Sequence, residues 1–445
     1  MTGRPRHYAE MIVRMSDGTI KQNNPLTGRE SWFVPGRGDR PLPHHKQDQR
    51  KPIEPKVVED YCSFCEAKYL ETPPEKARLV RDSQGTYQTQ QRLMPQELNK
   101  TRPLFRRVAN LFEIVTTDYW EKNYDYQLSP ELLAWKETYL SSPAGRKHAF
   151  GIVDSKLKLM GRSPQQIAGI TDYPEREKMS DAFFGGGHEL IIAGRHYKEV
   201  AQFDHEIYSS GEMSPEDHHR YILFTIDAVK DLYRVNRYIR YVVVFQNWLA
   251  PAGASFEHLH KQLVGLDEWG TDIENEVELV RDNPNAYNEL VVNFASYTNR
   301  VVAENEHAIA FVDIGHRFPT IAIYSKSPRL RPQEHDPEEV RGVSDLLHAC
   351  HAAMGSAVSC NEEWYFAPAD CLERIPWHIM IKWRVNNPAG FEGGTQIYIN
   401  PISYLQLRDQ LVPWLFLLRD QGRIGRMHIA QECQLSPNPL LYNRP

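Results

Sequence analysis

The feature that most constrains the fold of this chain is a pattern of strand, capped helix and strand that occurs twice. The helix starts at Ser214-Pro215 in the first copy and at Asp336-Pro337 in the second. The predicted strands cover residues 188–192 and 241–245 in the first copy, and 307–312, 320–324 and 377–385 in the second. This repetition predicts an α+β fold with two related halves.

Both helix starts carry the residues that a helix N-terminus favours. Ser214 and Asp336 can accept hydrogen bonds from the first turn, and the proline that follows each of them fits the first helical position. In the second copy Glu339 stands where a capping box requires it. Val340, Val343 and Leu347 then follow at spacings of three and four residues, which predicts one apolar helix face.

The chain divides into three predicted parts. Residues 1–60 are rich in Pro, Gly, Arg and Lys, and they predict an N-terminal arm with a short strand near Glu30–Val34. Residues 61–300 form the first predicted half and residues 301–445 the second. Ser129-Pro130 and Ser163-Pro164 are further helix starts, so residues 125–180 are predicted to be mostly helical.

Composition limits the class of function. The chain has 52 Lys plus Arg against 58 Asp plus Glu, a net charge of −6, and a general nucleic-acid binder would usually be basic. No apolar run approaches the roughly 18–20 residues of a membrane span, so no membrane partner is expected. Residues 1–20 lack the apolar core of a secretory signal. We therefore expect a cytoplasmic protein.

The most informative stretch is Gly253-Ala254-Ser255-Phe256-Glu257-His258-Leu259-His260-Lys261-Gln262. In an extended segment His258, His260 and Gln262 project from one face. Two imidazoles and an amide together can provide a metal ligand, a nucleophile and a neutral hydrogen-bond donor. A chance pair is the alternative, because the chain has 18 histidines. The Gly-x-Ser before the pair and the Gln after it favour a functional site.

A second candidate is the pair Cys62-x-x-Cys65, two of six cysteines in the chain. In a long chain without a secretion signal, such a pair is typical of a reducing compartment and of metal or redox chemistry. The pair could be a redox couple, or half of a zinc site completed by two histidines. The residues alone leave both interpretations open.

The histidine stretch resembles the motif Gly-x-Ser-x-x-His-Pro-His-x-Gln of galactose-1-phosphate uridylyltransferase and its relatives. This family belongs to the histidine-triad superfamily and includes ADP-glucose and dinucleoside-polyphosphate phosphorylases. Leu259 replaces the motif's proline. Similar matches follow the family's order along the chain: Asn24–Arg29, Pro35–Pro41, Cys62–Cys65, Val108–Phe112, Gly187–Glu189 with His196, and Phe391–Pro401.

The resemblance implies duplicated histidine-triad-like halves, each an antiparallel sheet with packed helices, fused in one chain. Residues 125–180 do not match the family, which implies a helical insertion in the first half. It also implies zinc held by Cys62, Cys65, His196 and His258. Two thiolates and two neutral imidazoles suit a closed tetrahedral zinc site. Some members have a second metal site with histidines in the C-terminal half, but Met380 and Lys382 stand at those positions here. We therefore expect that the second site is absent.

The resemblance further implies that His260 is a nucleophile that attacks the α-phosphorus of a nucleotide sugar. Gln262 would donate a hydrogen bond to a phosphate oxygen as charge develops on it. The remaining implied contacts are Ser255 with the β-phosphate, Asn110 and Asn247 with the nucleoside, and Arg37 and Arg40 with the diphosphate.

The implied function is that of a nucleotidyltransferase. The nucleotide of a nucleotide sugar would pass through a nucleotidyl-histidine to a sugar 1-phosphate, as in galactose metabolism. One alternative is a phosphorylase of ADP-sugars or dinucleoside polyphosphates, which would use phosphate as its acceptor. A second alternative is a zinc-stabilised nucleotide-binding protein without catalysis. The family also implies a homodimer.

Overall fold

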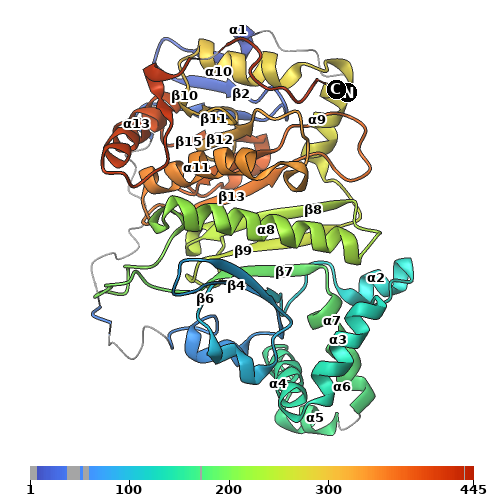
Figure 1. Cartoon of the computed structure of the whole chain (residues 1–445). Helices are drawn as coiled ribbons and strands as arrows, with labels where there is room; N and C mark the ends of the chain where they lie inside the picture. The colour runs from blue at the N-terminus through green and yellow to red at the C-terminus, as the bar shows by residue number, and fades with distance from the viewer. Residues whose placement is uncertain (1–7, 38–50, 54–59, 171–172, 435, 445) are drawn as a thin grey trace.

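The computed structural model of the chain describes residues 8–37, 51–53, 60–170, 173–434 and 436–444. Its centre is a 12-stranded sheet in the order β16-β10-β11-β12-β14-β13-β8-β9-β7-β6-β4-β5 (Figure 1). All neighbouring strands in it run antiparallel. On its N-terminal side lie β4 (Glu75–Arg81), β5 (Tyr87–Gln91), β6 (Pro103–Ala109), β7 (His188–Ala193), β8 (Tyr241–Trp248) and β9 (His260–Leu266). On its C-terminal side lie β10 (Val301–Glu304), β11 (Ala308–Asp313), β12 (Thr320–Ser325), β13 (Cys360–Tyr365), β14 (His378–Trp383) and β16 (His428–Ile429).

Both sides of this sheet have the same topology. From the centre outward the N-terminal side reads β8-β9-β7-β6-β4, with α8 (Pro215–Val235) between β7 and β8 in sequence. The C-terminal side reads β13-β14-β12-β11-β10, with α11 (Pro337–Met354) between β12 and β13. The predicted α+β fold is therefore confirmed, and the common topology agrees with duplicated halves. The domain boundaries near residues 60 and 300 stay predictions.

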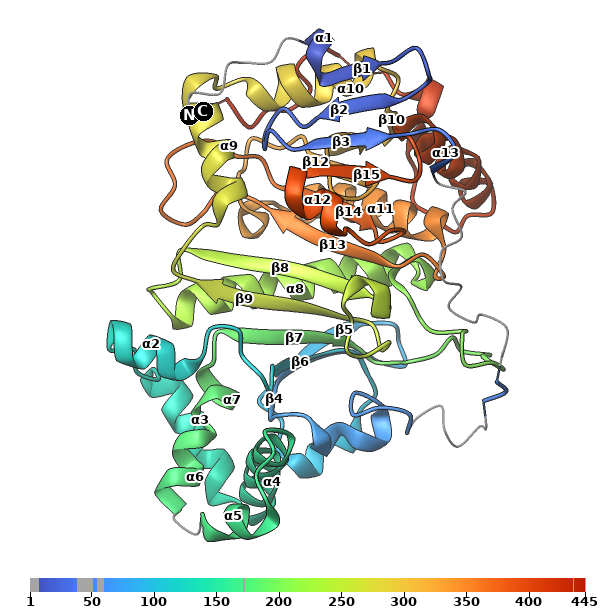
Figure 2. The same ribbon diagram turned by 180° about the vertical axis from the view of Figure 1, so that it is seen from behind.

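The two faces of the large sheet are covered differently. The helices α8 and α11 pack against each other on one face (Figure 1). On the other face a four-stranded sheet lies over the C-terminal side (Figure 2), so the N-terminal arm packs on the C-terminal half. Its strands are β1 (Ile12–Arg14), β2 (Ile20–Asn23), β3 (Glu30–Phe33) and β15 (Ile397–Asn400), and β15 pairs in parallel with β3.

The predicted helix starts are confirmed by their hydrogen bonds. The Ser214 side chain accepts from the N–H of Asp217 at the start of α8. Asp336 and Glu339 form the capping box of α11. The remaining helices include α1 (Tyr8–Met11), α9 (Thr271–Asp282), α10 (Asn293–Tyr297), α12 (Gly390–Thr395) and α13 (Tyr404–Asp420). No helix among the described residues is long and apolar enough to cross a membrane.

The helices predicted for residues 125–180 are present, and their assignment as an insertion stays a prediction. Ser129 and Ser163 cap their helices as expected. The helices pack around a core of their own at the end of the molecule distant from the C-terminal half (Figure 1). They are α3 (Pro130–Ser141), α4 (Pro143–Leu159), α5 (Pro164–Gly169), α6 (Tyr173–Met179) and α7 (Asp181–Gly185). The preceding helix α2 (Thr117–Tyr124) packs against the main core through Trp120.

A buried ion pair joins the two sides of the sheet where β8 pairs with β13. The ammonium of Lys261 lies 2.6 Å from a carboxylate oxygen of Glu362, and His351 Nε2 lies 2.9 Å from the other oxygen. Burial would raise the pKa of Glu362, but Lys261 and His351 lower it well below its usual value. Because side chains alternate along β9, Lys261 points toward α8 while His260 and Gln262 point to the opposite face.

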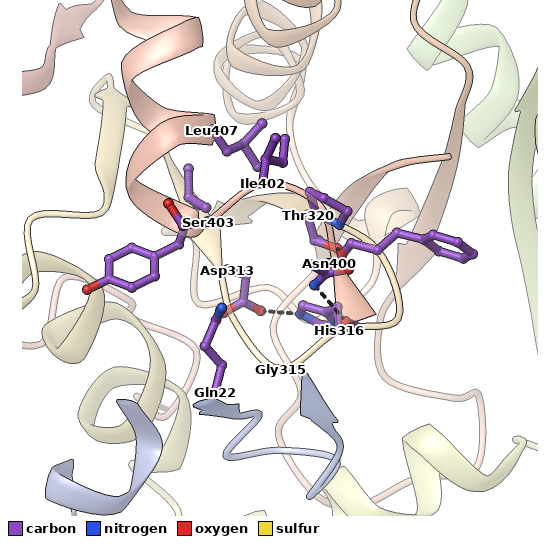
Figure 3. A pocket seen from close by; sticks show the side chains of 13 residues that line it. Gln22, Asp313, Gly315, His316, Thr320, Asn400, Ile402, Ser403 and Leu407 are labelled. Carbon is purple, nitrogen blue, oxygen red and sulfur yellow. Dashed lines mark hydrogen bonds and ion pairs between the residues drawn. The ribbon is translucent and has the colours of Figure 1, made fainter. Parts of the chain in front are cut away.

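A small polar pocket lies where the four-stranded sheet meets the large sheet (Figure 3). In it His316 Nε2 donates to Asp313 Oδ2 at 2.7 Å, and Asn400 Nδ2 donates to the carbonyl of His316 at 3.2 Å. Gly315 has a φ of 70°, and a Cβ there would lie 2.0 Å from the backbone nitrogen of Asn24. This contact therefore requires glycine. The pocket has a volume of ≈ 10 Å³, which is too small for a substrate. Its contacts hold the N-terminal arm against the large sheet.

Candidate active site and metal site

The loop between β8 and β9 carries the predicted site residues. Leu249 begins it with a φ of 68° and a ψ of 159°, a conformation that costs a non-glycine residue energy. Gly253 has a φ of 88°, which glycine adopts without strain. Ser255 is exposed on this loop, whereas His258 and His260 are buried. The strained turn returns the chain beside β8 with both histidines held inside the protein.

Four predicted metal ligands meet at the start of β9. Cys62 Sγ and Cys65 Sγ are 3.7 Å apart. His196 Nδ1 lies 3.4 Å from the sulfur of Cys62 and 3.6 Å from that of Cys65. His258 Nδ1 lies 3.5 and 3.8 Å from the same two sulfurs. The structure thus brings together residues from three distant segments of the chain, with all four ligand atoms within 4.8 Å of one another.

These distances fit a tetrahedral zinc ion. With Zn–S bonds of about 2.3 Å and Zn–N bonds of about 2.0–2.1 Å, a tetrahedron has edges of about 3.8 Å between sulfurs and about 3.6 Å from sulfur to nitrogen. The tautomer of His258 fits too, because its Nε2 donates to the carbonyl of Ala193 at 2.7 Å and leaves the Nδ1 lone pair facing the sulfurs.

The ring of His260 is held by the backbone of His258, one of the four candidate metal ligands. Its Nδ1–H donates to the carbonyl oxygen of His258 at 2.8 Å, so the lone pair is on Nε2. Burial lowers the pKa of His260 to about 4, and the ring is therefore neutral near pH 7. The ring of Phe64, from the Cys62–Cys65 loop, packs edge-on against His260 at a centroid distance of 5.3 Å. Metal loop and candidate nucleophile thus form one packed unit.

Gln262 is oriented by His188 on the adjacent strand β7 and by Asn110, which directly follows β6. The N–H of Ile114 donates to His188 Nδ1 at 3.2 Å, so His188 carries its proton on Nε2. That Nε2–H donates to Gln262 Oε1 at 3.1 Å, and Asn110 Nδ2 donates to the same oxygen at 3.4 Å. Burial lowers the pKa of His188 to about 4, which keeps this tautomer neutral. With its oxygen held by two donors, Gln262 presents its NH₂ group to the site.

His188 is the residue that the sequence analysis missed as a member of the site. It lies on β7 next to β9 and on the same sheet face as Gln262, because Leu190, two residues further along β7, pairs with Gln262. The signal that could have identified it is its place after Gly187 at the start of a predicted strand. That position alone does not reveal which strand becomes its neighbour.

The other predicted site residues are placed as follows. Asn247 is the second-last residue of β8, next to β9, and its Oδ1 accepts from Asn361 Nδ2 at 2.7 Å. Arg37 follows β3 on the C-terminal side, near Glu392 of α12, whereas β9 lies on the N-terminal side (Figure 2). The structure therefore does not bring Arg37 together with His260 of the same chain. Arg40 lies outside the described residues.

The positions that correspond to the second metal site of some family members carry Met380 and Lys382 in this chain. Met380 is buried, and the Lys382 ammonium contacts the carboxylate of Glu363 and lies 3.1 Å from the hydroxyl of Tyr365. Among the described residues, the Cys62–Cys65–His196–His258 group is the one cluster of His, Cys, Asp or Glu with metal-binding spacing.

The chain matches one family model and one curated protein. A family described as "Domain of unknown function (DUF4921)" matches residues 15–442. ADP-glucose phosphorylase of Arabidopsis thaliana is 25% identical over 178 residues, which are 37% of this chain and 49% of that protein. The match thus spans about half the length of this curated relative.

Two solved structures have the same fold. One is an ADP-glucose phosphorylase from Arabidopsis thaliana with bound ADP-glucose, at a TM-score of 0.56 and 17% identity, covering 88% of this chain and 98% of that chain. The other is a GalT-like protein from the same plant, at a TM-score of 0.52 and 16% identity, with coverages of 88% and 98%. These matches confirm the resemblance drawn from the motifs.

Proposed function

This chain belongs to the family described as a domain of unknown function (DUF4921), and from its site we propose that it is a nucleotidyltransferase that acts on a nucleotide sugar through a covalent nucleotidyl-histidine at His260. The observation that carries this proposal is the local geometry of His260. Its Nδ1–H is held by a backbone carbonyl, its Nε2 lone pair is available, and Gln262 lies on the same strand face.

The proposed reaction has two displacements. In the first, the Nε2 lone pair of His260 attacks the α-phosphorus, the bond to the bridging oxygen breaks, and the sugar 1-phosphate leaves with that oxygen. In the second, an oxygen of the acceptor phosphate attacks the same phosphorus, the P–N bond breaks and His260 is restored. Gln262 donates its amide hydrogen to a non-bridging oxygen while negative charge develops there.

The metal cluster has a supporting role in this proposal. Cys62, Cys65, His196 and His258 would hold zinc in a closed four-ligand site, which stabilises the fold. The carbonyl of His258 then holds Nδ1–H of His260 and so fixes the tautomer of the nucleophile. Positioning of His260, rather than chemistry at the metal, is the contribution of this cluster.

The proposal is tested by the mass of the intact protein after incubation with a donor. We expect ADP-glucose to add the mass of one adenylyl group, that is adenosine monophosphate less one water, in an adduct that survives alkali because it is a phosphoramidate. UDP-glucose and diadenosine tetraphosphate are the comparison donors. Absence of an adduct with all three donors would leave the catalytically silent binding protein as the better interpretation.

The acceptor distinguishes two versions of the enzyme. The curated relative is a phosphorylase, which favours inorganic phosphate as the acceptor of the nucleotide. A sugar 1-phosphate would be the acceptor in a uridylyltransferase-like enzyme. Addition of each acceptor to the isolated adduct separates the two, because only the true acceptor removes the nucleotide at a rate that matches turnover.

Leu259 replaces the proline of the family motif. This departure would favour the alternative of a zinc-stabilised nucleotide-binding protein without catalysis. The side chain of Leu259 is buried, and its carbonyl oxygen accepts from the N–H of Ala193 at 2.9 Å. The acceptor is a backbone oxygen, which proline also has, so the substitution leaves this strand contact unchanged. The homodimer implied by the resemblance stays a prediction.

A substitution at His188 tests the orientation of Gln262. We expect His188→Leu to slow adduct formation by about 10- to 100-fold, as is typical for loss of a residue that orients a site residue, with little change in the half-saturating donor concentration. His188→Gln keeps a side-chain N–H donor and is expected to restore most of the rate. The control is His205→Leu on an exposed loop. Equal slowing by His188→Leu and His188→Gln would contradict the positioning role.

A further inference from the structure

The candidate site contains a second oriented amide, that of Asn247 on β8. Phe245 pairs with Gln262 across β8 and β9, and Asn247 lies two residues further along β8, toward the end where β9 begins with His260. Because side chains alternate along a strand, Asn247 shares the sheet face of Gln262 and His260. Neighbouring strands are about 4.8 Å apart, so this amide lies one strand away from the candidate nucleophile.

The amide of Asn247 is held by Asn361, a buried residue of the C-terminal half. The two residues pair directly where β13 runs beside β8 (Figure 2), so their side chains project from the same face. Asn361 Nδ2 donates to Asn247 Oδ1 at 2.7 Å and to the carbonyl of Ala252 at 2.8 Å. Ala252 belongs to the loop between β8 and β9 that carries Ser255. Asn361 therefore contacts both a side chain and the loop of the candidate site.

The direction of the Asn361 amide is set by Arg384, which directly follows β14. Arg384 Nη1 donates to Asn361 Oδ1 at 2.8 Å, and its guanidinium lies 4.4 Å from the centroid of the Phe318 ring. A guanidinium has donors only, so it requires the amide oxygen on its side. The carbonyl of Ala252 is an acceptor only, so it requires the NH₂ group on the other side. Reversal of Asn361 would lose both contacts.

The polarity of Asn247 follows from that of Asn361. Its Oδ1 accepts from Asn361, which leaves its Nδ2 as the group that can bind a ligand. A Cβ at Gly253 would lie 3.9 Å from this Nδ2, so the NH₂ group faces the loop between β8 and β9. Gln262 also has its oxygen held by N–H donors. Two NH₂ groups on neighbouring strands beside His260 suit a ligand that offers acceptor atoms, as phosphate and nucleoside oxygens do.

We propose that Asn361 is a positioning residue of the candidate active site, and that through it Asn247 presents an N–H to an acceptor atom of the nucleotide sugar. Arg384 supports this arrangement by holding the direction of the Asn361 amide. Both halves of the chain thus contribute to one site. This inference rests on the proposed function, because that function places the nucleotide sugar over His260.

Binding of ADP-glucose to His260→Ala protein tests the proposal without catalysis. We expect Asn361→Leu to weaken the affinity measured by calorimetry by about 10-fold, because the amide of Asn247 is then free to rotate. Asn361→His keeps an N–H for Asn247 and should restore most of the affinity. The matched control is Asn293→Leu, which removes another amide pair, since Asn293 Nδ2 donates to Asn438 Oδ1 at 2.8 Å.

A double-mutant cycle separates positioning from a purely structural role. If Asn361 acts through Asn247, Asn361→Leu should change the affinity by less than about 2-fold in protein that already carries Asn247→Ala. Thermal midpoints measured in parallel report the structural effect, which should be the same in both backgrounds. Equal losses of affinity with and without the Asn247 side chain would overturn the proposal, because Asn361 would then act through the loop at Ala252. An unchanged affinity in Asn361→Leu would overturn it too.

Arg384 is tested in the same way. We expect Arg384→Leu to weaken ADP-glucose binding by about 3-fold, because the Asn361 amide can then reverse, and to have no further effect in Asn361→Leu protein. A loss that persists in that background would overturn the part assigned to Arg384.

The adduct experiment distinguishes this inference from the proposed function. A nucleotidyl adduct in the parent protein, together with independent effects of Asn361 and Asn247 on binding, would overturn the positioning role alone. Coupled effects on binding without any adduct would overturn the proposed catalysis and leave the roles of Asn361 and Asn247 standing.

Discussion

His260→Ala protein is expected to form no nucleotidyl adduct with any donor and to lose nearly all turnover. The neutral ring of His260 is the group whose Nε2 would make the new bond to phosphorus, and alanine has no atom that can replace it. Loss of a covalent nucleophile typically lowers the rate by about 10⁴- to 10⁶-fold. Intact mass after alkaline quenching and a steady-state assay with ADP-glucose and phosphate measure the two effects.

The matched control for this experiment is His428→Ala. His428 is exposed on β16, at the opposite end of the 12-stranded sheet from the candidate site. We expect its adduct yield and rate to equal those of the parent protein. An adduct that persists in His260→Ala, or one that maps to another residue by peptide mass analysis, would show that the nucleophile has been misidentified.

Loss of the metal cluster is the second large effect that we expect. Purified protein should contain about one zinc per chain, and Cys62→Ser or Cys65→Ser should release it. Structural zinc contributes roughly 10–16 kcal/mol of apparent binding free energy in small zinc domains. Even a part of that, about 5 kcal/mol, is a large share of the stability of a typical protein. We therefore expect a marked fall in the thermal midpoint, measured together with metal content.

The same substitutions should slow adduct formation. The carbonyl of His258 holds the Nδ1–H of His260, and Phe64 packs on its ring, so both supports depend on an ordered metal loop. Cys433→Ser is the matched control, because Cys433 is a half-buried cysteine outside the cluster. Protein purified without chelators that contains no zinc would refute the assignment. Full zinc content in Cys62→Ser would refute it equally.

Much of the fold could be predicted from local sequence patterns. The caps at Ser214 and Asp336 placed the starts of α8 and α11, since a cap depends on atoms within one helical turn. Alternating and continuous apolar runs located the central strands for a similar reason. The pairing of β8 with β13, which joins the two sides into one sheet, had no local signal. Strand order depends on contacts between residues that are far apart in the sequence.

The candidate site also has parts that local sequence patterns predict and parts that depend on distant contacts. The motif placed His260 and Gln262 on one face, because that depends only on the alternation of side chains along a strand. The grouping of Cys62 and Cys65 with His196 came from a family resemblance, and the structure places these atoms at zinc-binding distances. For Arg37, the expected contact with the site is not seen within the chain. The arm that carries it packs on the other half of the molecule.

The sequence by itself determined the elements of this protein and the chemistry that they carry: capped helices, strands, a thiol pair and a two-histidine strand. Each of these depends on neighbours within a few residues. Only the tertiary structure decided which groups cooperate. The hydrogen bond from His188 to Gln262 spans 74 residues, and Cys62 meets His258 across 196 residues. Such contacts are set by strand order and register, which arise when the whole sheet assembles around its core.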